Sequence, residues 1–407
     1  MSLAVASRAR RSLPAQGSAE ARERSARRRI GLAWGLLVLN VVGYVGLIVH
    51  VPSVLGKAAT QGALPLALLV LLTVNRRAIV RPSVFLCLVT LLPIEAILTA
   101  LDPQFFGTVY RTFRLAEFVV ALWLLSPWWG RRDLMLVRYH LVALGVILTS
   151  VLIGALVVPG HAFLAGRLNG AIWVIPGTQV AHYAAVTIGL VSVLWLCGLM
   201  QGRVTLFIVV VAGAILILTH TRTALVGLIA GLAVAGLSLL KGNARARKLF
   251  AIGTIMISIA VITVSGLITT WLARGESTHG LTELTGRTKV WGPLLAFPRG
   301  RIQEIFGFGL SNSSFNGLPI DSNWMSSYQE QGLFGVAVCA AIILLLFVTA
   351  YFRPMGVQRA LALFLVTYCL VASFTEDGFT DATPYLLELA VAASLLMPPI
   401  LTRPRPP

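Results

Sequence analysis

Three charged residues in the second half of the chain are of types that could act on a phosphate-bearing substrate. Arg222 lies between two long apolar runs, whereas Arg287 and Asp321 lie in the one long hydrophilic segment. A guanidinium group forms a planar fork that matches phosphate oxygens, and a carboxylate can take a proton from an attacking hydroxyl. Arg222 would lie at or near a bilayer boundary, where an ionisable side chain is costly and by default functional.

Each of these residues also has a plain structural interpretation. A single arginine at a membrane boundary can extend its long side chain to the interface and do nothing else. Asp321, which is followed by Ser322 and Asn323, can form a turn or cap the helix that begins after it. Taken one at a time, the residues leave both interpretations open.

The composition predicts that membrane helices position these residues. Of the 407 residues, 57% are hydrophobic and only 12% are charged, and the mean hydropathy is +0.85. A globular protein carries roughly 25% charged residues. The composition therefore excludes an ordinary soluble enzyme, a disordered chain and a nucleic-acid-binding domain. The four cysteines lie singly in apolar runs, so we expect buried thiols and no disulfide framework.

About twelve apolar runs approach the roughly 20 residues that a membrane-spanning helix needs. The sequence therefore predicts an all-α fold, a polytopic membrane bundle of about 12 helices. In the eighth run, Gly227 and Gly231 form a GxxxG pattern that allows close helix packing. The runs are 31–51, 55–74, 82–101, 114–129, 139–159, 180–199, 203–219, 222–240, 249–271, 328–351, 358–374 and 384–401.

The distribution of Lys and Arg predicts the orientation of this bundle. Most of them fall on the side that also holds both termini, which the positive-inside rule assigns to the cytoplasm. The acidic residues Glu376, Asp377 and Asp381 then fall on the outer side. The predicted parts are a disordered basic cytoplasmic tail at 1–30, helices 1–9 within 31–271, an extracytoplasmic catalytic loop at 272–327, helices 10–12 within 328–401 and a cytoplasmic tail at 402–407.

The hydrophilic loop mixes apolar and polar motifs, as a lid on the membrane surface over a cavity would. Gly286-Arg287-Thr288-Lys289-Val290-Trp291 predicts the start of a short amphipathic helix. Arg287 and Trp291 are four residues apart and so share a face of that helix. The motifs that follow are Phe306-Gly307-Phe308-Gly309, Asp321-Ser322-Asn323-Trp324 and Gly332-Leu333-Phe334-Gly335.

The order of these motifs resembles the O-antigen ligase and O-antigen polymerase family, a group of GT-C-like membrane glycosyltransferases. The family has about twelve spans, an arginine at an outer helix end and a large late loop that opens with Gly-Arg-x-x-x-Trp. The matching elements are Arg167-Leu168-Asn169-Gly170, Arg222, Gly286-Arg287…Trp291, Gly307…Gly309, Asp321…Asn323 and Gly332…Gly335. Ligases of the family usually have a His where this chain has Asp321, and Ser322 displaces the Asn by one position.

The resemblance implies the transfer or polymerisation of a glycan at the outer face of the cytoplasmic membrane. The donor would be a polyprenyl-diphosphate-linked glycan, the acceptor a hydroxyl of a glycan or glycolipid, and no metal or other cofactor would be needed. Asp321, Arg287 and Arg222 would be catalytic. Substrate would be bound by Arg222, Arg287, Arg167, Trp291, Asn323 and His220.

Ionisable residues inside the predicted spans leave a second function open, a transporter or flippase of lipid-linked sugars. Glu95, Glu117 and Glu388 could relay protons or could be paired structurally. Arg111 and Arg114 lie near Glu117 in the chain, which predicts that they form a structural pair with it or line a donor groove. Against a transporter, the sequence shows no inverted repeat.

Overall fold

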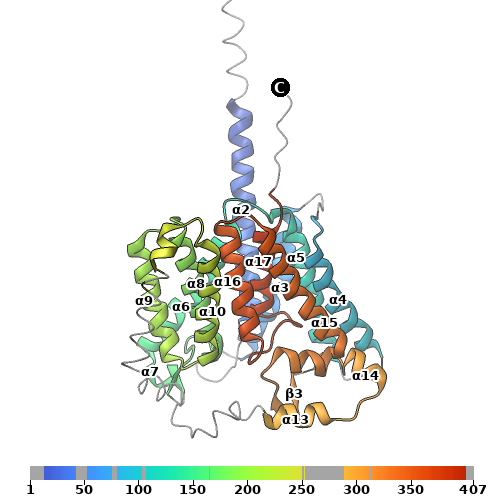
Figure 1. Ribbon diagram of the computed structural model, residues 1–407. Helices are drawn as coiled ribbons and strands as arrows, with labels where there is room; N and C mark the ends of the chain where they lie inside the picture. The colour runs from blue at the N-terminus through green and yellow to red at the C-terminus, as the bar shows by residue number, and fades with distance from the viewer. Residues whose placement is uncertain are drawn as a thin grey trace, which may run out of the picture.

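The structure is a computed structural model that describes residues 13–42, 53–75, 80–102, 107–164, 166–249, 252, 288–311 and 313–399. This part of the chain is a bundle of helices, and its β-structure consists of two short antiparallel hairpins (Figure 1). The long helices are α2 (Leu13–Val41), α3 (Ser53–Val74), α4 (Val84–Leu101), α5 (Val109–Leu125), α6 (Met135–Val157), α8 (Gly177–Leu196), α9 (Gly202–Leu218), α10 (Arg222–Leu239), α15 (Asn323–Phe352), α16 (Val357–Ala372) and α17 (Pro384–Leu396).

Six of these helices are long and apolar enough to cross a membrane, namely α3, α4, α6, α8, α10 and α15. Three shorter ones, α9, α16 and α17, are also apolar. Every predicted apolar run overlaps one of the long helices except 249–271, of which the structure describes only residues 249 and 252. The chain is therefore an all-helical membrane protein, as its composition predicts.

Residues 13–30 are helical, so the prediction of a disordered tail over 1–30 is wrong for them. They form the first part of α2, which rises beyond the rest of the bundle (Figure 1). Glu23 and Arg27 form an i,i+4 ion pair at 3.1 Å, and Arg27 also contacts Asp133 at 2.8 Å. Tyr139 donates a hydrogen bond to the carbonyl of Arg27. These contacts tie the basic segment to the start of α6 and stabilise its helical form.

Close packing of α10 against α16 confirms the prediction made from Gly227 and Gly231. A Cβ atom on Gly231 would lie 2.8 Å from the ring of Phe364, and one on Gly227 would lie 3.0 Å from the ring of Tyr368. Both aromatic residues belong to α16 and are buried. Without side chains at the two glycines, the backbones of the two helices approach closely.

The connections of the bundle lie at two opposite ends. At one end lie the start of α2 and the end of α17 (Figure 1). The other end, called the hairpin end here, carries the short elements and the long α16–α17 connection. Its short elements are α7 (Pro159–Ala162), β1 (Phe163–Leu164), β2 (Arg167–Leu168), α13 (Thr288–Ala296), α14 (Arg301–Phe306), β3 (Ser314–Phe315) and β4 (Leu318–Pro319).

Candidate functional site

Arg222 is the first residue of α10, and the turn before it is held by Arg167. Arg167 Nε donates to the carbonyl of Thr219 at 3.0 Å, and one Nη donates to the hydroxyl of Thr221 at 3.2 Å. His220, between these two threonines, has a left-handed backbone with φ of 50°. The structure therefore brings together Arg167, His220 and Arg222, three of the residues that the sequence singled out.

The segment between α16 and α17, residues 373–383, connects this arginine region to the rest of the hairpin end. The hydroxyls of Thr223 and Thr375 share a hydrogen bond of 2.6 Å, which places the segment against the start of α10. The segment also contains Asp377 and Asp381. We call residues 373–383 the acidic segment.

Asn323 fixes the acidic segment from the start of α15. Its backbone N–H donates to the carbonyls of Ser373 and Glu376, both at 2.9 Å, and its Oδ1 accepts from the N–H of Phe379 at 2.6 Å. The side chain is fully buried. These contacts suit a positioning role for Asn323 better than the predicted contact with substrate.

Asp321 is exposed on the surface of the hairpin end, two residues before α15 begins. The N-cap residue of α15 is Ser322, so the alternative prediction that Asp321 caps this helix is wrong. An exposed carboxylate at this end of the bundle is accessible to a large acceptor. Its role as the base stays a prediction.

Trp291 belongs to a small apolar cluster that joins α13 to the following elements. It packs with Val290, Leu294, Phe315 and Ile320. Packing of the partly buried indole against this cluster accounts for a tryptophan at this position without any contact to a sugar. Arg287, its predicted partner on the same helix face, lies outside the described residues.

Arg111, near the start of α5, lies at the centre of an ion-pair cluster that the sequence does not predict. Its guanidinium contacts Glu330 at 2.6 Å and Asp381 at 2.9 Å. Arg114 reaches Asp381 at 3.9 Å and donates to the carbonyl of Ala382 at 2.6 Å. The expected pairing of these arginines with Glu117 is therefore wrong, because their acidic partners lie more than 200 residues away in the chain.

Glu330 is fully buried, and one of its two carboxylate oxygens gathers several donors. Besides Arg111, its Oε1 accepts from the backbone N–H groups of Ser311 and Ser313, each at 3.0 Å. Charge-assisted hydrogen bonds of this kind offset the cost of removing a carboxylate from water. The contacts hold the segment before β3 against α15, so the cluster is part of the framework of the hairpin end.

Two carboxyl groups of the acidic segment have opposite titration behaviour. Burial, together with the negative charge of Glu330, raises the pKa of Asp377 to about 7. Burial alone would also raise the pKa of Asp381, but Arg111 and Arg114 outweigh it, and the pKa of this carboxyl is lowered. Neighbouring carboxyls with separated pKa values are typical of acid–base sites. Asp377 is therefore a second candidate base, and its only signal in the sequence is its place in an acidic segment on the predicted outer side.

An apolar groove lies beside the buried polar cluster. It has a volume of about 320 Å³ and is lined by Leu91, Ile94 and Leu98 of α4, with Phe306 and Phe334 opposite. Glu95, which is buried, also lines it. Gln331, adjacent to Glu330, donates to the carbonyl of Leu92 at 3.1 Å and so joins the polar cluster to the helix that forms the groove.

A further buried polar group lies inside the bundle between α8, α16 and α17. His182 Nε2 approaches the carboxylate of Glu388 at 2.7 Å, and His182 Nδ1 lies 3.1 Å from the hydroxyl of Tyr368. His140 of α6 lies 3.9 Å from the same carboxylate. Glu388 is therefore paired with histidines, and both interpretations of it, a structural pair and a proton relay, stay predictions.

No protein-family model matches the chain, and no curated protein sequence matches it either. The resemblance to the O-antigen ligase and polymerase family therefore rests on the motifs in this sequence.

Proposed function

We propose that the chain is a membrane glycosyltransferase that transfers or polymerises a glycan from a polyprenyl-diphosphate donor onto an acceptor hydroxyl. The observation that carries this proposal is that Arg167 holds the turn immediately before Arg222 at the hairpin end, and that the Thr223–Thr375 hydrogen bond joins the start of α10 to the acidic segment. Guanidinium groups and a carboxyl at one end of a membrane bundle are what such a transfer requires.

In this proposal the arginines bind the diphosphate and a carboxylate activates the acceptor. The base takes the proton of the acceptor hydroxyl while its oxygen forms a bond to C1 of the donor sugar. The bond between C1 and the diphosphate oxygen breaks, and polyprenyl diphosphate leaves with its charge stabilised by Arg222 and Arg287. Asp321 remains the base proposed from the sequence, and Asp377 is the alternative that its environment supports.

The apolar groove beside α4 supports a substrate that carries a lipid. Exposed apolar side chains form its walls, including Leu98 at 65% and Ile94 at 48% exposure. Hydrocarbon on the substrate would replace lipid there without exposing apolar surface to water. We assign the hairpin end to the extracytoplasmic face and the opposite end, with both termini, to the cytoplasm, because the chain's Lys and Arg favour that orientation.

The test is a transfer assay with the purified chain and a lipid-linked oligosaccharide. We expect release of polyprenyl diphosphate and a longer or newly attached glycan. Arg222→Ala should lower the rate by about 10²–10³, as loss of a charge stabiliser does. Arg287→Ala should do the same. Arg203→Ala, at the opposite end of the bundle, is the matched control and should keep the activity.

Full activity of Arg222→Ala and Arg287→Ala, with correctly folded protein, would show that these arginines do not stabilise the leaving group. Absence of any new glycosidic bond with every lipid-linked glycan tested would exclude the transferase itself.

Transport of lipid-linked sugars is the second candidate function, and buried ionisable groups within the helices favour it. The His182–Glu388 pair and Glu95 lie inside the bundle, where such groups often mark proton or substrate pathways. Proteoliposomes distinguish the two functions. Movement of the lipid-linked glycan between leaflets without a new glycosidic bond would support the transporter.

A further inference from the structure

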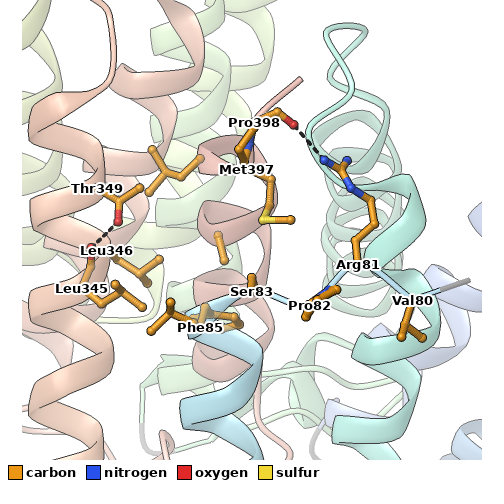
Figure 2. Close-up of a pocket in the computed structure, with 13 residues that line it drawn as sticks. Val80, Arg81, Pro82, Ser83, Phe85, Leu345, Leu346, Thr349, Met397 and Pro398 are labelled. Carbon is orange, nitrogen blue, oxygen red and sulfur yellow. Dashed lines mark hydrogen bonds between the residues drawn. The ribbon is translucent and has the colours of Figure 1, made fainter. Parts of the chain in front are cut away.

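A second groove lies at the end of the bundle opposite the candidate site. It has a volume of about 460 Å³ and lies between the start of α4, the second half of α15 and the end of α17. Figure 2 shows Phe85, Leu345 and Leu346 on its apolar side and Arg81 with Pro398 on its polar side. The groove therefore has an apolar body and one cationic edge.

Arg81 is held in place by neutral partners. One Nη donates to the carbonyl of Trp129 at 2.9 Å, and the other donates to the carbonyl of Pro398 at 3.2 Å (Figure 2). Within the described ranges no carboxylate forms an ion pair with it. Arginine has five N–H donors, so donors remain beyond these two bonds. Arg81 is partly exposed, and among the described residues no acidic side chain neutralises its positive charge.

Arginine side chains and helix ends together give the edge of the groove a net positive charge. The carboxyl end of α17, which carries about half a negative charge, lies beside it. Arg353 donates to the carbonyls of Leu396 and Met397 at 2.9 and 3.2 Å, so two full positive charges face this helix end. The amino end of α4, with Ser83 as its N-cap, adds a positive partial charge to the same edge.

The apolar part of the groove is continuous with the surface that faces lipid. Val80 and Val84 line it and are 42% and 62% exposed. On α15, Leu344 and Val348 beside the groove are also exposed. A hydrocarbon chain from the surrounding leaflet can enter such a groove without crossing water. A soluble anion would leave the apolar walls unfilled.

We propose that this groove binds one anionic phospholipid, with an acyl chain along Phe85, Leu345 and Leu346 and the phosphate at Arg81 and the first turn of α4. The positive charge at the edge of the groove complements the anionic headgroup. Because the groove is continuous with the lipid-facing surface, an acyl chain can enter it from the leaflet. The site lies at the opposite end from the proposed transfer site and does not depend on that function.

The test is lipid binding to the purified full chain in detergent, measured by native mass spectrometry with phosphatidylglycerol and with phosphatidylcholine. The wild type should retain one phosphatidylglycerol molecule in preference to phosphatidylcholine. Arg81→Gln keeps donors for the two carbonyls but removes the charge, and it should weaken phosphatidylglycerol binding roughly tenfold, as loss of a charge-assisted hydrogen bond does. Arg81→Lys should keep the preference.

Two matched controls separate this site from general effects. Arg245, at the same end, also donates to a backbone carbonyl but does not line the groove, so Arg245→Gln should bind as the wild type does. Thr349→Phe should fill the groove and weaken the binding of both lipids. Leu344→Phe, five residues earlier on the same helix and outside the groove, should leave the binding of both unchanged.

The proposal would be overturned by equal binding of the two lipids to the wild type. Unchanged phosphatidylglycerol binding to Arg81→Gln would overturn it too. Displacement of the bound lipid by glycerol phosphate would point instead to a site for a soluble anion.

Discussion

Asp377 and Asp381 are four residues apart, yet their surroundings drive them to opposite protonation behaviour. Asp381 faces Arg111 and Arg114, so the positive charges keep its carboxylate ionised. Asp377 is near Glu330, and the hydroxyls of Ser313 and Ser326 only partly offset its burial. At neutral pH one carboxyl is therefore a fixed charge, while the other can exchange a proton.

The first prediction concerns the pH dependence of the proposed transfer. Because its pKa is raised to about 7, Asp377 is neutral below this pH and ionised above it. If Asp377 is the base, kcat/KM rises with pH through about 7, and Asp377→Asn removes this rise and lowers the rate by about 10²–10⁴. Asp321→Asn is the comparison, measured over the same pH range. Loss of activity in Asp321→Asn with the rise intact in Asp377→Asn would assign the base to Asp321.

The second prediction concerns the stability contributed by Arg111. Its side chain is 16% exposed and its partner Glu330 is fully buried, so Arg111→Ala leaves a buried carboxylate without its cation. We expect a loss of about 3–5 kcal/mol of unfolding free energy. Arg27→Ala breaks two ion pairs whose side chains are all about a third or more exposed, those with Glu23 and Asp133, and should cost no more than about 1 kcal/mol for each pair. Chemical unfolding in detergent measures the unfolding free energy of each variant. Equal losses in the two variants would contradict the structural role assigned to Arg111.

The sequence predicts which site residues lie together when they are neighbours in the chain. It does not predict contacts between residues that are far apart in the chain. His220 and Arg222 belong to one turn, so their proximity follows from local spacing. Arg111 and Glu117 are six residues apart, which puts them on different faces of a helix because each residue turns it by about 100°. No local spacing predicts the contact between Arg111 and Glu330, because it depends on how α5 packs near α15.

At the scale of elements, small residues predict where two helices can pack closely, whereas tertiary contacts determine where a helix begins. The GxxxG pattern correctly predicted that α10 packs closely, because the absence of side chains is a local property, but it did not identify α16 as the partner. The start of α2 was predicted to be disordered from its polar composition. Its helix depends on Asp133 and Tyr139, which belong to another part of the chain.

The third prediction compares two glycines within helices. Gly231→Ala places a Cβ 2.8 Å from the ring of Phe364 and 3.0 Å from its carbonyl oxygen. Overpacking of this kind should cost about 1–3 kcal/mol. Gly213→Ala in α9 meets nothing within 4 Å and should stabilise the helix by about 0.5–1 kcal/mol. Thermal unfolding of the two variants should therefore shift in opposite directions, and a stabilised Gly231→Ala would contradict the close contact.

At the scale of the whole molecule, hydropathy identifies the helices but does not decide which ones face lipid. α17 has 13 residues and is about 20 Å long, shorter than the roughly 30 Å hydrocarbon core. Its residues from Leu386 to Leu396 are buried within the bundle, so other helices shield it from lipid. The requirement of about 20 apolar residues applies to helices in contact with the bilayer. A count of apolar runs therefore predicts the fold class more reliably than it predicts the number of membrane crossings.

The last prediction tests the orientation on which the proposed function depends. In a chain without its native cysteines, Arg301→Cys places a thiol on α14 at the hairpin end, and Lys241→Cys places one just beyond α10 at the opposite end. Both positions are exposed. A membrane-impermeant maleimide added to intact cells should label the thiol at 301, and the thiol at 241 should react only after permeabilisation. The cysteine-free chain is the control. The reverse labelling pattern would put the arginines and acidic segment in the cytoplasm, where an extracytoplasmic transfer cannot occur.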